Sequence, residues 1–404
     1  MIKKNIKNNI INLGFIQIIN IFVPLIVYPL SIHRLGMESM GTIVYYQGLV
    51  SFFAIFINYG FYITGAKYTS ENRNDKKKLS EVVCSILLIK VIIWFFCLFV
   101  ILLVGHLPFF KLDNLMLLLA FLSTFYELLF MQWFFQGVEK LKIIVILNGF
   151  FKAIQLLLIY SLVLNNNSSY IYLTIISSCN FFTGLFSIIF AFKIHNLLIV
   201  FPQFKEIKKI FLDSGFLFLA NITNSIKDRL SLILIGNNLG MSYVASYDLA
   251  IRIINMSLIP INLVVDAIFP SLSRNYKSNK IMILSLYALS TSLFFILIEY
   301  FGIEHIVRIL SGENNIVSIN LAKIALIAIP IISVSTVLGK LGLIASGKNR
   351  DFLHIVIKTV STYIILIGLL YLSGNFDSVY AFLLVTVFIY AVELLFRYIS
   401  FKKY

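Results

Sequence analysis

The sequence contains few charged residues and few cysteines. Asp, Glu, Lys and Arg make up 13% of its 404 residues, against about 25% in soluble domains, while 60% of the residues are hydrophobic. The three cysteines, Cys84, Cys97 and Cys179, lie in or beside apolar runs at spacings that match no metal or redox motif. This composition excludes a soluble globular domain, a disulfide-rich secreted domain and a cysteine-based metal site.

The motifs of several enzyme classes are also missing. The sequence has no phosphate-binding loop, no nucleophile elbow and no HExxH motif. The five histidines stand at span ends and in loops without metal-ligand spacing. We therefore expect no cofactor, no metal ion and no enzymatic activity.

Long apolar runs dominate the sequence instead. A bilayer core of ~30 Å requires about 20 apolar residues in a helix, and its backbone hydrogen bonds must close within the segment. The first run lacks a small-residue cleavage site, which favours a retained helix over a signal peptide. The runs predict twelve helical spans, at 10–32, 41–66, 82–105, 114–135, 143–164, 170–192, 211–235, 244–269, 282–303, 321–346, 353–373 and 376–397. We predict an all-α integral membrane protein.

The basic residues indicate the orientation. The net charge is +15, but most Lys and Arg lie in the short gaps between spans, so we expect no nucleic-acid partner. One alternating set of connections and tails, in which we count Arg397, holds 22 Lys and Arg, and the other set holds 3. The positive-inside rule then predicts that both termini are cytoplasmic.

The chain has a candidate midpoint. Its longest connection, 193–210, lies near the middle, and short matches link the two halves: FIQIIN at 15–20 with FLFLAN at 216–221, and LGM at 35–37 with LGM at 239–241. Transporters are often built from such parallel repeats. We predict two six-helix bundles, 1–200 and 201–404, around a central cavity.

Eight cations lie inside the predicted spans. A charge at the centre of a membrane helix costs ~2.5–3.5 kcal/mol, so such residues face a bundle interior or water. Lys323 lies near a span end, from which its ammonium reaches the interface. The other seven are Lys90, Lys152, Lys227, Arg229, Arg252, Lys340 and Lys358.

The seventh and eighth spans carry the densest polar faces. In the seventh, Lys227, Asp228 and Arg229 interrupt the segment NSIKDRLSLILIG, and helical spacing places Asn221, Asn224, Ser225 and Asp228 on one face. In the eighth, Asp248, Arg252, Asn255, Asn262 and Asp266 form one stripe. Asp248 and Arg252, at i and i+4, are placed to pair. These patterns predict a hydrated, partly paired group of charges.

The first half is less charged. Gln17 and Asn20 share a face of the first span, and Gln47 and Asn58 share a face of the second. These amides suit sugar hydroxyls, but an intramembrane amide more often makes an interhelical hydrogen bond, which is the alternative for Gln17, Asn20 and Asn58. Lys90, Lys152, Lys340 and Lys358, with Glu127, form a second tier nearer the cytoplasm. Snorkelling or an ion pair with Glu127 is the alternative for Lys90 and Lys152.

Two halves, a cation-lined cavity and no energy-coupling domain indicate a secondary transporter for an anionic substrate. The chain also resembles a known family. The features are LGM followed by Gly41, the segment QWFFQGVEK from Gln132 to Lys140, and YDLAIRI then IFPSLSR around the eighth span. Over essentially its whole length it is similar to the polysaccharide-transporter (Wzx-type) flippases of the multidrug/oligosaccharidyl-lipid/polysaccharide superfamily.

The resemblance implies a flippase that moves an undecaprenyl-pyrophosphate-linked sugar repeat unit, such as an O-antigen unit, to the outer face of a bacterial inner membrane. Arg suits phosphate oxygens, because its guanidinium donates two parallel hydrogen bonds. The candidate substrate-binding residues are Lys227, Arg229, Arg252, Lys90, Lys152, Lys340, Lys358, Gln47, Asn58, Asn221 and Asn255. The candidate ion-coupling carboxylates are Asp228, Asp248, Asp266 and Glu127.

The expected partners are the lipid-linked oligosaccharide, membrane lipids, H⁺ or Na⁺ and a polysaccharide polymerase, with the chain itself a monomer. Two alternatives stay open. A cation-coupled drug or metabolite antiporter of the same superfamily would have a more acidic cavity. A membrane-embedded polysaccharide polymerase would need a long loop with catalytic carboxylates or His, and the longest outer connection, 304–320, is short.

Overall fold

The computed structural model describes residues 2–105, 112–165, 168–274, 276, 278–312 and 315–403. Some residues in these ranges are described by their backbone alone: 2–22, 25, 216, 220, 221, 223, 224, 227, 228, 267, 270, 271, 273, 274 and 349. Within the described ranges the regular structure is helical throughout, as the apolar runs predict.

The chain divides into two compact units. Unit 1 comprises Met1–Ser39 and Tyr46–Ile222, and unit 2 comprises Met40–Tyr45 and Thr223–Tyr404. The bundles predicted over 1–200 and 201–404 stay a prediction. Unit 1 holds most of α1 (Ile2–Asn58), then α2 (Phe61–Asn72), α3 (Lys76–Gly105), α4 (Asn114–Leu122), α5 (Phe125–Leu129), α6 (Gln132–Gly137), α7 (Leu141–Leu162), α8 (Ser169–His195) and the first part of α9 (Phe204–Asn238).

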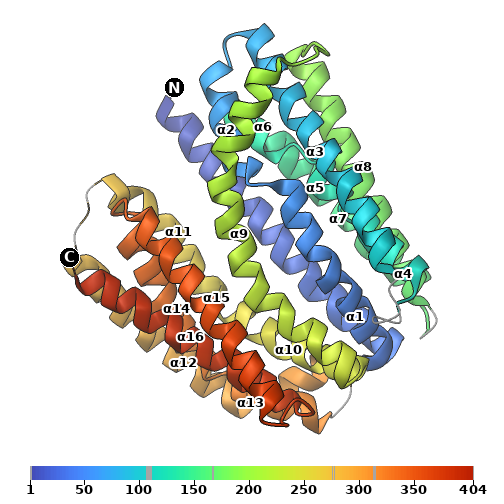
Figure 1. Ribbon diagram of the computed structural model, residues 1–404, viewed down its shortest axis with the longest axis vertical. Helices are drawn as coiled ribbons and strands as arrows, with labels where there is room; N and C mark the ends of the chain where they lie inside the picture. The colour runs from blue at the N-terminus through green and yellow to red at the C-terminus, as the bar shows by residue number, and fades with distance from the viewer. Residues whose placement is uncertain are drawn as a thin grey trace. The chain divides into compact units, whose positions relative to one another are not determined.

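Unit 2 includes Met40–Tyr45 of α1 and the part of α9 from Thr223 onward. It contains α10 (Met241–Ser257), α11 (Ile259–Arg274), α12 (Ser278–Ser311), α13 (Ile316–Ala325), α14 (Ala328–Thr336), the π-helix η2 (Val337–Ile344), α15 (Asn349–Leu372) and α16 (Val379–Lys402). In Figure 1, α7 and α8 lie side by side in unit 1, and α15 and α16 do so in unit 2.

Helices lie at the places of the predicted spans, with small shifts. In the described part of the chain, nine helical stretches are long and apolar enough to cross a membrane, or ten if α10 and α11, bent by 44°, form one span. The predicted span at 211–235 lies in α9, and the predicted first span at 10–32 lies in α1. The span predicted at 114–135 is three short helices, α4 to α6, and the one at 321–346 is α13, α14 and η2.

Two glycines explain how a short part of α1 joins unit 2. A Cβ at Gly41 would lie 1.8 Å from the backbone oxygen of Met241, and one at Gly236 would lie 2.3 Å from the ring of Tyr45. The Tyr45 hydroxyl also hydrogen-bonds Asn237 Oδ1. Nearby, Gly36 has φ 76° and ψ 168°, a conformation that only glycine adopts without strain, and it breaks α1. The LGM…Gly41 pattern is therefore a close-packing feature.

The QWFFQG segment forms the core of unit 1. Trp133, Phe134 and Phe135 in α6 are each at most 2% exposed. Trp133 packs on Gly65 of α2, where a Cβ would come within 2.8 Å of its ring. Just beyond α6, Glu139 pairs with Arg73 across 3.1 Å. The aromatic side chains of this segment therefore pack α6 against α2.

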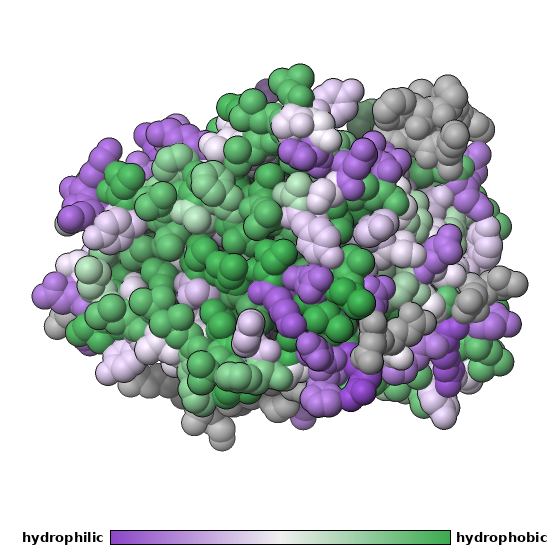
Figure 2. Space-filling model, turned by 90° about the horizontal axis from the view of Figure 1, so that it is seen from below, coloured by the Kyte–Doolittle hydropathy of each residue, from purple (hydrophilic) through white to green (hydrophobic). Residues whose placement is uncertain are grey.

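The outer surface is rich in apolar side chains. Figure 2 shows them covering much of the face in view, with polar groups in separate patches. Only 22% of the most apolar window of α12 is buried, and its Phe301 is 81% exposed. In a membrane protein, such a helix faces lipid.

Candidate functional site

Unit 1 holds a span that is broken twice, and side chains of neighbouring helices satisfy its free backbone groups. Between α5 and α6 the Met131 N–H bonds Ser187 Oγ (3.1 Å) and no longer reaches the Glu127 carbonyl. Lys90 Nζ on α3 donates to that carbonyl instead (2.7 Å). Further donors are Ser177 Oγ to the Leu119 carbonyl (2.6 Å) and Asn180 Nδ2 to the Ser123 carbonyl (3.0 Å). A broken helix survives in a membrane only with such replacements.

Lys90 is thus placed as a structural group. Its side chain is buried, with 2% of the residue exposed. The Glu127 carboxylate accepts a hydrogen bond from Asn58 Nδ2 (2.6 Å), and in the described part of the chain no ion pair within 4 Å joins it to Lys90. The structure brings three predicted residues, Lys90, Glu127 and Asn58, together at the break between α5 and α6.

The other predicted residues of unit 1 lie apart from this break. Lys152 on α7 donates to Gln155 Oε1 of its own helix (3.0 Å). Gln47 is half-buried in α1. Gln17 and Asn20 lie outside the described side chains. The ion pair with Glu127 that we considered for Lys152 is therefore replaced by a bond to a neighbouring amide.

In unit 2, two of the predicted span cations, Arg252 and Lys340, pair with carboxylates. Arg252 Nε bonds Asp248 Oδ2 at 2.6 Å, as the i, i+4 spacing on α10 predicts. Lys340 pairs with Asp266, although 74 residues separate them. The Lys340 side chain is 40% exposed and that of Arg252 is 33% exposed. Each of these two cations is therefore both paired and partly exposed.

Lys340 occupies an unusual backbone position. It lies in the π-helix η2, an irregularity that is common at functional sites. Its ammonium lies 5.9 Å from the centre of the Phe269 ring. One side of the same helix, through Val337 and Leu341, lines an apolar cavity of about 160 Å³.

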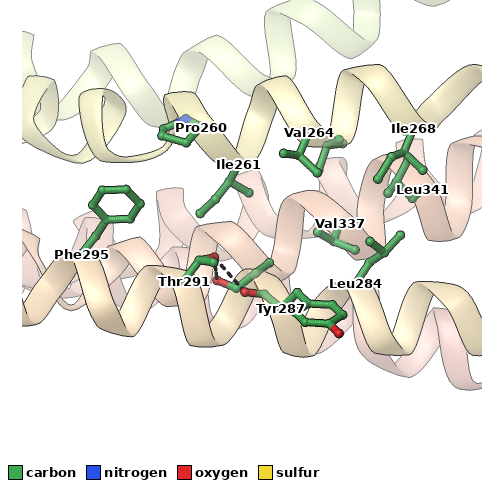
Figure 3. A pocket seen from close by; sticks show the side chains of 12 residues that line it. Pro260, Ile261, Val264, Ile268, Leu284, Tyr287, Thr291, Phe295, Val337 and Leu341 are labelled. Carbon is green, nitrogen blue, oxygen red and sulfur yellow. Dashed lines mark hydrogen bonds between the residues drawn. The ribbon is translucent and has the colours of Figure 1, made fainter.

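This cavity lies between α11, α12 and η2. Figure 3 shows three rows of side chains around it, with Pro260, Ile261, Val264 and Ile268 from α11, Leu284, Tyr287, Thr291 and Phe295 from α12, and Val337 and Leu341 from η2. Thr291 Oγ1 donates to the backbone of its own helix, at Tyr287 and Ala288. The lining is therefore almost entirely apolar, and the cavity suits a hydrocarbon.

For the remaining predicted residues of unit 2, the structure describes fewer contacts with partners. Arg229 is half-buried and has no hydrogen bond or ion pair among the described groups. Asn255 on α10 and Lys358 on α15 are exposed. The side chains of Lys227 and Asp228, and that of Asn221 in unit 1, lie outside the described residues. The group of charges expected from Lys227 to Arg252 therefore stays a prediction.

One prediction was wrong. We assigned Arg397 to a cytoplasmic tail, but α16 continues to Lys402 and Arg397 is 9% exposed. It pairs with Glu393 and donates to the carbonyl (2.8 Å) and hydroxyl (3.0 Å) of Ser335. Glu393 and Arg397, at i and i+4, carried a sequence signal that the span boundary at 397 hid.

Two carboxylates outside the predicted set also have defined partners. Tyr68 donates to Asp213 where α2 packs on α9. Glu299 on α12 contacts Ser257 Oγ at 2.6 Å. Neither contact has a spacing that a sequence reveals, because the partners are on different helices.

The comparisons with known proteins agree with this picture. Residues 6–277 match the family described as "Polysaccharide biosynthesis protein". This chain belongs to that family. It is 24% identical to a Shigella dysenteriae protein named "Putative O-antigen transporter", over 87% of this chain and 89% of the relative. A protein of the same name from Escherichia coli (strain K12) is 22% identical, over 69% of this chain and 68% of the relative.

Solved structures share the fold. The "Lipid II flippase MurJ, inward closed conformation" superposes with a TM-score of 0.73 at 13% identity, covering 96% of this chain and 87% of that one. An inward-facing "multidrug resistance MATE family transporter of the MOP superfamily" gives 0.70 at 13% identity, covering 95% of each chain. The likeness confirms the predicted fold class, the all-helical, twelve-helix, two-bundle architecture of this superfamily. As a member of this family, the chain is a multi-pass membrane transporter and not an enzyme.

Proposed function

We propose that this protein is a flippase for a lipid-linked oligosaccharide. Its cargo is an undecaprenyl-pyrophosphate-linked repeat unit of a surface polysaccharide, such as an O-antigen, and it moves the unit from the cytoplasmic to the outer face of a bacterial inner membrane. The family membership and the names of the curated relatives support the substrate class. The orientation, with both termini in the cytoplasm, rests on the distribution of Lys and Arg.

One observation carries the proposal: membrane-spanning helices of unit 2 hold cations that are only partly covered. Lys340 and Arg252 keep 40% and 33% of their side chains exposed although each contacts a carboxylate. A pyrophosphate brings at least two negative charges into a low-dielectric slab, where unpaired charges are expensive. Lys340 and Arg252 supply the opposite charge, and Arg229 adds a cation without a carboxylate partner among the described groups.

The carboxylates set how tightly the anion is held. When a phosphate oxygen approaches Lys340, it competes with Asp266 for the same ammonium, so binding costs the ion pair and stays reversible. The exposed amide of Asn255 suits a sugar hydroxyl. The transport cycle we propose is alternating access, coupled to H⁺ or Na⁺ through Asp228, Asp248, Asp266 or Glu127. A polymerase partner and a monomeric state belong to the same proposal.

Reconstituted vesicles test the function. The lipid-linked repeat unit is placed in both leaflets, and its sugar is attacked from outside with a reagent that does not cross the membrane. We expect the protein to make nearly all of the substrate accessible, whereas empty vesicles expose about half. Equal accessibility with and without the protein, with and without an imposed ion gradient, would contradict a flippase.

A further inference from the structure

Glu299, on the spanning helix α12, pairs with no cation within 4 Å in the described part of the chain. Asp248 pairs with Arg252, Asp266 with Lys340, and Glu393 with Arg397. Glu299 Oε1 instead lies 2.6 Å from Ser257 Oγ. Its Oε2 is enclosed and has no hydrogen-bond partner among the described groups. An ionised carboxylate in this setting would be an uncompensated buried charge, which is strongly unfavourable.

The hydrogen-bond geometry at Ser257 gives a second, independent argument. Ser257 Oγ lies 2.8 Å from the carbonyl of Ile253 and 2.6 Å from Glu299 Oε1. A serine hydroxyl has one proton and can donate to only one of these oxygens. If the carboxylate were ionised, one of the two close contacts would be between two acceptors. A proton on Glu299 resolves this, because Glu299 then donates to Ser257 Oγ and Ser257 donates to the Ile253 carbonyl.

The charged groups on the neighbouring helices do not change the conclusion that Glu299 carries a proton. On α10 the charged residues are Asp248 and Arg252, which bond each other. On η2, Lys340 is held by Asp266 of α11, and on α13, Lys323 lies 3.2 Å from Glu304. Helix α14 has no titratable residue, and on α16 Glu393 is held by Arg397. Each of these cations already contacts a carboxylate other than Glu299.

The contact between Glu299 and Ser257 lies at the junction of two helices. Ser257 is the last residue of α10, and α10 and α11 meet there at a bend of 44°. Pro260 in the first turn of α11 has no backbone N–H, which weakens the hydrogen bonding across the junction. The contact between Glu299 and Ser257 therefore joins α12 to a bend between two helices.

We propose that Glu299 is a proton-binding site inside the membrane, occupied in this conformation, where the bound proton ties α12 to the bend between α10 and α11. Loss of the proton converts the contact with Ser257 from donor to acceptor and leaves a charge that the surrounding helices do not compensate. The angle between α10 and α11 is then free to change. This site does not depend on the identity of the cargo, so its failure and that of the proposed flippase are separable.

Infrared spectroscopy tests the proposal directly. A protonated carboxyl has a C=O stretching band that a carboxylate lacks, and the purified protein is studied in a detergent without ester carbonyls, which absorb in the same region. At neutral pH we expect one such band in the wild type. Glu299→Gln should remove it, and Asp266→Asn, at a carboxylate paired with Lys340, should leave it. Absence of the band at neutral pH, or its survival in Glu299→Gln, would overturn the proposal.

A second variant keeps the test decisive if Glu299→Gln folds poorly. Ser257→Ala retains the acid but removes its acceptor, so the band should persist and shift to higher frequency. An unshifted band in Ser257→Ala would contradict the assigned hydrogen bond. Thermal unfolding adds an independent readout: alkaline pH should lower the wild-type midpoint more than that of Glu299→Gln, and equal pH dependence would count against the site.

Discussion

The two units accommodate charge in the membrane in different ways. In unit 1, Lys90 is almost fully buried and its ammonium replaces a missing backbone donor at the break between α5 and α6. In unit 2, Arg252, Lys340 and Arg397 each contact a carboxylate, and two of these pairs remain partly exposed. A charge inside a span can therefore be part of the backbone scaffold or part of a site, and exposure and partner type distinguish the two.

The largest effect is expected at the buried pair of α16. Arg397→Met leaves Glu393, which is 4% exposed, without its cation. Breaking a buried pair in this way costs about 3–5 kcal/mol. The free energy of unfolding, or the thermal midpoint in detergent, measures the loss. The double variant Arg397→Met/Glu393→Gln should regain most of it, and a double variant as unstable as the single one would contradict the pairing.

A smaller effect is expected at Lys90. Lys90→Met keeps the length of the side chain but leaves the Glu127 carbonyl without a donor, which costs about 1–3 kcal/mol. Lys152→Met is the matched control, because among the described groups Lys152 bonds an amide of its own helix and no backbone carbonyl. The free energies of unfolding of both variants test whether Lys90, and not Lys152, is part of the backbone scaffold of unit 1. If Lys90→Met were as stable as the wild type but lost transport, Lys90 would belong to the cargo site.

Of the three sites, the partly exposed Lys340–Asp266 pair should contribute least to the free energy of unfolding. Exposed ion pairs contribute ~0–1 kcal/mol, so Lys340→Ala should change the unfolding free energy by no more than this. Its effect should appear in binding instead. Titration with inorganic pyrophosphate should show weaker binding to Lys340→Ala and unchanged binding to Lys323→Ala. Equal affinity in both variants would remove Lys340 from the site.

Outside the spans, Asp113 gives a prediction on pH. Hydrogen bonds from the Tyr170 hydroxyl and from the Met116 N–H lower the pKa of the Asp113 carboxyl. A carboxylate with a lowered pKa in the fold stabilises it above its ordinary pKa, and the contribution disappears as the pH falls through the lowered value. Asp113→Asn should therefore flatten the acid limb of thermal stability. Tyr170→Phe should flatten it partly, and an unchanged acid limb in both would refute the assignment.

How far the sequence determines these features depends on the distance between partners. The spans follow from apolar runs, and the Asp248–Arg252 pair follows from helical spacing. The Lys340–Asp266 pair joins α11 to a π-helix, and neither the packing of those helices nor the π register is visible in local sequence. The break after Leu129 carries no proline or glycine, so the role of Lys90 was hidden too. Arg397 was misplaced because an apolar window ends before a helix does.

The central claim is that the partly exposed cations of unit 2 hold the phosphorylated head group during its passage. The most direct test is the vesicle assay with Arg252→Ala, Lys340→Ala and the charge-neutral double variant Lys340→Ala/Asp266→Asn, at equal amounts of folded protein. Lys323→Ala serves as the control, since its partner Glu304 is largely exposed. We predict that all three cation variants slow translocation at least tenfold while Lys323→Ala matches the wild type. Wild-type rates in Arg252→Ala and Lys340→Ala would contradict the account.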